Sequence, residues 1–138
     1  MKSVADWHQH RAPTLVQFEA IAQGAYQKLP APFRDMTKDV IIRVEEFPTD
    51  EVLDSLGIES PFGLLGLYHG VNLANQSVFN VTTLPEMIFL YRRPILGYWA
   101  EHTDSLGEII THVLVHEIGH HFGLSDNDME NIESEAAG

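Results

Sequence analysis

The chain has 138 residues, a length typical of one domain, so we expect a single domain over residues 1–138. Hydrophobic residues make up 44% of it, which is enough for a buried core and excludes a mainly disordered chain. The net charge of −12 argues against nucleic acid and against anionic membrane surfaces as partners. Cysteine is absent, so disulfides and thiolate metal sites are excluded and any metal must be held by nitrogen and oxygen atoms.

The N-terminal segment, residues 1–12, is predicted to be loosely ordered. Asp6, His8 and Arg11 interrupt it, so we expect no secretory signal there. The stretch from residue 60 to residue 85 lacks charged side chains, but its amides, prolines and glycines make it unfit to cross a membrane. We therefore expect a cytoplasmic protein with no membrane partner.

The next part of the chain is predicted to form a helix, a strand and a short second helix. Apolar residues recur every three or four positions over Thr14–Lys28, and Pro30 follows as a terminator. Val40–Val44 is short and β-branched, as in a buried strand. Glu51–Leu56 has a capping sequence before it and Gly57 after it, which indicates a brief helix.

The middle of the chain is predicted to be mostly loop. Glycine, proline and amide residues are frequent over residues 57–82, with weak strand patterns around Leu64–Tyr68 and Val78–Thr82. Met87–Tyr91 is a clear strand with a proline on each side. Ile95–Trp99 is expected to form one turn of helix.

The strongest helical pattern covers Asp104–Phe122, with Asp104 as the expected cap and Gly123 as the end. Nine acidic residues and no basic ones lie from Trp99 to Gly138, which favours a solvated helical surface, the alternative being a negative field around a cation. The apolar stripe of the long helix consists of Leu106, Ile109, Ile110, Val113, Leu114 and Ile118.

A metal-binding pattern lies inside this helix. His116 and His120 are four residues apart, so both imidazoles lie on one face and can bind one tetrahedral cation. Glu117 projects beside them, where a carboxylate can take a proton from a metal-bound water. The spacing predicts a zinc site with Glu117 as the general base.

Catalytic zinc usually has a third protein ligand. Gly123 allows the chain to leave the helix through a positive φ, and the following turn can bring a side chain back toward the two imidazoles. Asp126, six residues after His120, is the carboxylate best placed for this, and Asp128 and His121 are the alternatives.

The segment His116–Asp126 reads H-E-x-x-H-x-x-G-x-x-D and resembles the small bacterial zincin-like metallopeptidases, which are minimal relatives of the metzincins. Leu64–Tyr68 and Leu90–Ile95 are similar to other recurrent segments of that family, so the likeness extends over about Leu15–Asn131. Further residues that match are His121, Phe122, Asp128 and Met129.

This resemblance implies an α+β zincin-like fold with a small mixed sheet, a backing helix, an active-site helix and a strand above the cleft. It implies Zn²⁺ as the cofactor, with His116, His120 and Asp126 as metal ligands and Glu117 as the catalytic residue. Two features depart from metzincins proper, which have histidine at the place of Asp126 and a methionine turn well downstream, where this chain has Met129.

The expected function is a zinc-dependent peptidase acting on short peptides or unfolded proteins. The alternative is a metal-binding regulatory or interaction module with little turnover; an intact Glu117 favours the enzyme, because a structural zinc site needs no acid–base group.

Three further features have a structural and a functional interpretation. We interpret His112 as lying near the metal site or on the surface without binding the metal. Tyr68 is interpreted as a packing residue, the alternative being an oxyanion-stabilising donor. Arg92 and Arg93 are interpreted as ion-pair partners that neutralise the acidic helix, rather than as ligands of a substrate carboxylate.

Overall fold

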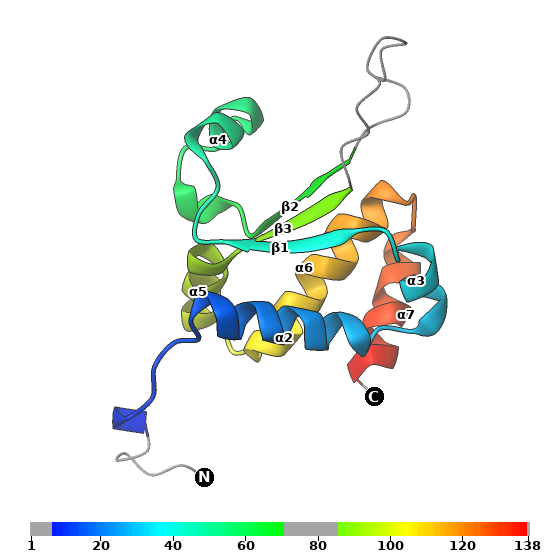
Figure 1. Cartoon of the computed structure of the whole chain (residues 1–138), viewed down its shortest axis with the longest axis horizontal. Coiled ribbons are helices and arrows are strands. Elements are labelled where there is room, and N and C mark those ends of the chain that lie inside the picture. Colours follow the sequence, from blue (N-terminus) through cyan, green and yellow to red (C-terminus); the bar gives the residue numbers. More distant parts are fainter. Residues whose placement is uncertain (1–6, 71–85, 138) are drawn as a thin grey trace.

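A three-stranded mixed sheet organises the fold of the computed structural model, which describes residues 7–70 and 86–137 (Figure 1). Strand β3 (Met87–Tyr91) lies in the middle, parallel to β1 (Ile41–Glu45) and antiparallel to β2 (Gly66–His69). Val44 pairs with Leu90 in the parallel register. The predicted α+β fold with a small mixed sheet is confirmed.

The described residues also contain six α-helices and one 3₁₀-helix. The long helices α2 and α6 lie on one face of the sheet, where α2 contacts β1 and α6 contacts β2 and β3 (Figure 1). The helices are α2 (Leu15–Gln27), α3 (Ala31–Met36), α4 (Asp50–Leu56), η1 (Pro61–Gly63), α5 (Arg92–Glu101), α6 (Leu106–His121) and α7 (Asp126–Ala137).

Local capping explains where the first predicted helices begin and end. Helix α2 starts after Thr14, whose hydroxyl accepts from the N–H of Gln17 at 3.2 Å while the Gln17 amide accepts from Thr14 N–H at 2.9 Å. Helix α4 follows Thr49, whose hydroxyl accepts from Val52 N–H, and stops at Gly57 with a left-handed φ of 68°. Both predicted helices are confirmed.

The helix after β3 is longer than the sequence indicated. One turn was expected over Ile95–Trp99, but α5 begins at Arg92 and includes Pro94. A proline in the first turn of a helix costs no hydrogen bond, because the N–H groups of that turn have no partner within the helix. The predicted strand at Met87–Tyr91 agrees with β3, and the one at Val78–Thr82 lies outside the described residues.

The predicted long helix is confirmed as α6, with a correction at its start. Ser105, not Asp104, is the cap: its hydroxyl accepts from Glu108 N–H at 3.1 Å. The helix ends as expected before Gly123, which has a φ of 77°.

Two helices were not predicted. Pro30 was taken as a terminator, but it is the N-cap of α3, where its fixed φ suits the start of a new helix. In α7, acidic side chains obscure an apolar stripe that consists of the buried Met129 and the half-buried Ile132 and Ala136.

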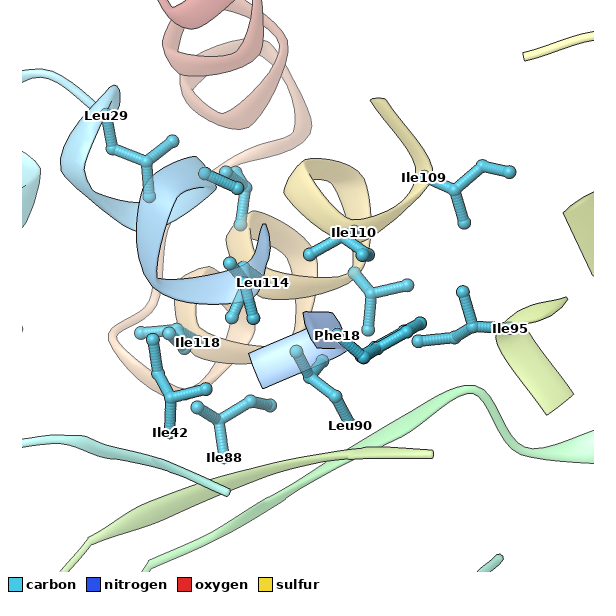
Figure 2. Close-up of a cluster of buried hydrophobic side chains, with 14 of the residues drawn as sticks. Phe18, Leu29, Ile42, Ile88, Leu90, Ile95, Ile109, Ile110, Leu114 and Ile118 are labelled. Atoms are coloured by element: carbon cyan, nitrogen blue, oxygen red, sulfur yellow. The ribbon is translucent and has the colours of Figure 1, made fainter. Parts of the chain in front are cut away.

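The core fills the space between the sheet and α6. In Figure 2, Ile110, Leu114 and Ile118 of α6 project toward side chains of the strands and of α2. The fully buried Phe18 comes from α2, and the equally buried Ile88 and Leu90 come from β3 (Figure 2). The predicted stripe therefore anchors α6 to the sheet and to α2.

Among the helices of the described residues, none has the length and apolar character needed to span a membrane.

An ion-pair cluster fixes the start of α5. The Arg92 guanidinium donates to both carboxylate oxygens of Glu46, at 3.0 and 3.2 Å, and to the Pro13 carbonyl at 2.6 Å. Arg93 donates to Glu46 as well, at 3.1 Å. Partial desolvation acts to raise the pKa of Glu46, but hydrogen bonds from Arg93 and Arg92 outweigh it and hold this pKa below its ordinary value. Both arginines form ion pairs as predicted, but their partner is Glu46, directly after β1, and not the acidic helix.

Arg92→Ala should lower the free energy of unfolding by about 1.5–3 kcal/mol, because its charged hydrogen bonds are lost from a side chain that is only 11% exposed. Arg93→Ala is the matched control; this side chain is 55% exposed, so the change should stay within about 1 kcal/mol. Urea unfolding at pH 7 measures both. Equal losses would contradict the distinction.

The same cluster has a pH dependence. Because the pKa of Glu46 is lower in the folded than in the unfolded state, its stabilisation is fully present above the unfolded pKa and is lost as pH falls through the folded value. The difference between wild type and Arg92→Ala should therefore shrink in unfolding experiments at acidic pH.

Candidate metal centre

Three histidines form a column along α6. His112, His116 and His120 follow one another at intervals of four residues, which places them on one side of the helix. The ring centroids of His112 and His116 are 3.9 Å apart, and those of His116 and His120 are 5.8 Å apart with the rings nearly perpendicular. The buried apolar stripe fixes the rotation of α6, so the column is held in place by the core.

The central histidine has an unused ligand atom. The Nε2 atom of His116 is buried and makes no hydrogen bond. A buried polar atom without a partner carries a desolvation cost that a bound cation would remove. His120 is exposed at the end of the column.

Glu117 lies next to this column and faces the edge strand β2. Burial raises the pKa of Glu117, while the charge of His120 and the backbone N–H of Tyr68 act in the opposite direction. A carboxylate whose pKa is raised is a better proton acceptor than an ordinary surface glutamate. This is the electrostatic setting that a general base needs.

Helix α7 brings the carboxylate of Glu133 close to two histidines of the column, His112 and His116. The Oε1 atom of Glu133 is 2.7 Å from His112 Nδ1, and its Oε2 atom is 3.5 Å from His116 Nε2. Within the part of the chain that the structure describes, these three residues form a group whose ligand atoms all lie within 4.8 Å of one another. The group contains His116 of the predicted set but not His120 or Asp126. Sequence reasoning did not single out Glu133.

Asp126, the predicted third ligand, and the alternatives Asp128 and His121 each lie in a different environment. Asp126 is the exposed first residue of α7. Asp128 forms a capping box with Ser125: its carboxylate accepts from Ser125 N–H at 3.2 Å and its own N–H donates to the Ser125 hydroxyl at 3.1 Å. His121 stacks on Tyr68, with ring centroids 4.0 Å apart, and its Nε2 atom is 3.8 Å from a Glu86 oxygen.

Tyr68 connects β2 to the end of α6. Its ring contacts His121 face to face and Phe122 edge to face. Burial and the nearby Glu86 carboxylate raise the pKa of Tyr68 well above its ordinary value, so the phenol stays protonated. These contacts support the packing interpretation and leave the Tyr68 phenol neutral beside Glu86.

The donor atoms of the site fit a zinc ion. Imidazole nitrogens and a carboxylate are ligands that zinc commonly takes, and the buried Nε2 of His116 lacks any other partner. Together with the fold, they define a candidate metal centre on a helix that packs against a mixed sheet.

The family model described as zincin-like metallopeptidase matches residues 37–136, well over half of the chain. The protein therefore belongs to the zincin-like metallopeptidase family, as the motif resemblance predicted. No curated protein matches the sequence significantly.

Proposed function

We propose that this protein is a zinc-dependent peptidase that hydrolyses short peptides or unfolded polypeptides. Two neighbouring groups on one turn of α6 carry the proposal. His116 has a buried imidazole nitrogen without a hydrogen-bond partner, and Glu117 has a carboxylate with a raised pKa. A site that only stabilises the fold requires the first of these but not the second. Membership of the zincin-like metallopeptidase family supports the same reaction class.

Each residue has a distinct role in this proposal. His116 and His120 hold the metal through neutral imidazole nitrogens, and one acidic ligand completes the set, for which the motif spacing names Asp126. When bound, zinc polarises a carbonyl and lowers the pKa of water. Glu117 takes a proton from the attacking water and returns it to the leaving amine. Burial raises the pKa of Glu117, which favours the first of these two proton transfers.

The edge strand favours an extended peptide as the substrate. Among the described residues, β2 pairs with β3 alone, and it lies beside the helix that carries Glu117. An extended chain can add to such an edge through backbone hydrogen bonds, which gives affinity with little dependence on side chains. A folded protein rarely offers a free extended segment, so we propose unfolded chains and short peptides. A cytoplasmic location remains a prediction.

Metal analysis tests the proposal. We expect freshly purified protein to bind about one zinc per chain, and His116→Ala to lose it, because one of three ligands is removed. His102→Ala is a matched control, since this exposed histidine lies at the end of α5 and its Nδ1 atom contacts the Tyr98 carbonyl. Elemental analysis after gel filtration gives the occupancy. Full occupancy in His116→Ala would contradict the site.

A further inference from the structure

The packing of α7 on α6 determines which acidic side chain faces the histidine column. The buried Met129 lies against Gly119, where a Cβ atom would come within 2.7 Å of its sulfur. A larger residue at this point would require the Met129 side chain to shift. Helix α7 runs back along α6, so one turn after Met129 its side chains reach the preceding turns of α6. Glu133, four residues after Met129, is the residue that arrives there.

The two oxygens of Glu133 meet the histidines at different distances. The 2.7 Å contact between Oε1 and His112 Nδ1 is a hydrogen bond. The 3.5 Å separation of Oε2 and His116 Nε2 is not one, and the His116 nitrogen has no other partner. Two ligands of a tetrahedral zinc with bonds of about 2.0–2.1 Å lie about 3.3–3.4 Å apart. The second distance therefore suits two atoms that share a metal, and the first suits a residue that holds a ligand in place.

We propose that Glu133 is the acidic ligand of the zinc site and that His112 is a positioning residue that orients its carboxylate. This assignment rests on the proposed function and puts Glu133 in the role that the motif spacing gives to Asp126. The side chain of Glu133 is only 24% exposed, whereas Asp126 is an exposed residue at the start of α7, two turns earlier. A histidine that donates to the free oxygen of a metal-binding carboxylate is a common way of fixing such a ligand.

Zinc affinity of single variants tests the assignment, measured by competition with a chromogenic chelator. Glu133→Gln should weaken zinc binding by more than about 100-fold, beyond the 10–100-fold typical of residues that only hold a ligand. Glu130→Gln, an equal charge change at an exposed position of the same helix, should leave the affinity unchanged. Asp126→Asn should retain zinc as well. Visible absorption of the Co²⁺ form gives a second readout, since Glu133→Gln should alter the coordination and Asp126→Asn should not.

The positioning role of His112 has its own test. His112→Ala should weaken zinc binding by about 10–100-fold, and His112→Asn should recover most of the loss, because the Asn amide places a donor near the position of His112 Nδ1. Equal weakening in both variants would overturn the hydrogen-bonding role.

The possible failures are distinguishable. Unchanged zinc affinity in Glu133→Gln, or a loss in Asp126→Asn as large as in Glu133→Gln, overturns the assignment while the proposed function stands. Zinc retained in His116→Ala overturns the proposed function itself. Thermal unfolding of every variant in the presence of a chelator checks the fold; Glu133→Gln is nearly isosteric, so its metal-free transition should match that of the wild type.

Discussion

Glu117→Gln should bind zinc as tightly as the wild type but hydrolyse peptides about 10²–10⁴-fold more slowly, the range that a general base contributes. Glutamine keeps the size of the side chain but cannot accept the proton of water. The effect should appear in kcat, because the base acts on the transition state and not on substrate binding. Initial rates with a fluorogenic peptide mixture and with denatured casein, together with metal analysis, measure both properties.

Glu108→Gln is the matched control for this experiment, because Glu108 is an exposed carboxylate in the first turn of the same helix. Its rate should equal that of the wild type. If Glu117→Gln lost the metal, the glutamate would be a ligand and the proposed division of roles would be wrong. If the zinc-loaded wild type and Glu117→Gln were equally inactive on every peptide, the binding-module alternative would be favoured.

The predictable parts of the fold are those specified by neighbouring residues. Strand β3 could be recognised from five apolar residues between prolines, and α6 from a stripe with period 3.6 that ends at Gly123. Helix α3 was missed because a proline can follow the end of one helix or stand at the start of the next, and Pro30 was interpreted only in the first way. Helix α7 was missed because its apolar positions are few. The Ser125-x-x-Asp128 capping box was the signal that could have indicated its start.

In the candidate site, too, local sequence relations could be predicted and tertiary contacts could not. His116, Glu117 and His120 could be named because helical periodicity alone puts them within one turn of each other. The contact of Glu133 with the column depends on how α7 packs over Gly119, a tertiary relation between residues fourteen positions apart. Spacing along the sequence points only to residues in the turn directly after the motif, and Asp126 is the carboxylate there. One usable signal was the i, i+4 relation between Met129 and Glu133, which places a carboxylate on the buried side of an otherwise solvated helix.

Leu114→Ala should lower the free energy of unfolding by about 2–5 kcal/mol, because it removes a fully buried side chain from the helix that carries the motif and leaves a cavity beneath it. Leu56→Ala deletes the same atoms from the last residue of α4, where the leucine is 48% exposed, so its loss should stay below about 1 kcal/mol. Urea unfolding in the presence of a chelator isolates the packing effect, because bound zinc would add its own stabilisation to the folded state.

Leu114 lies between His112 and His116 in sequence but on the opposite side of α6, so Leu114→Ala disturbs the support of the column and leaves every proposed ligand unchanged. Equal losses in the two variants would show that the core under α6 does not anchor it as the packing indicates.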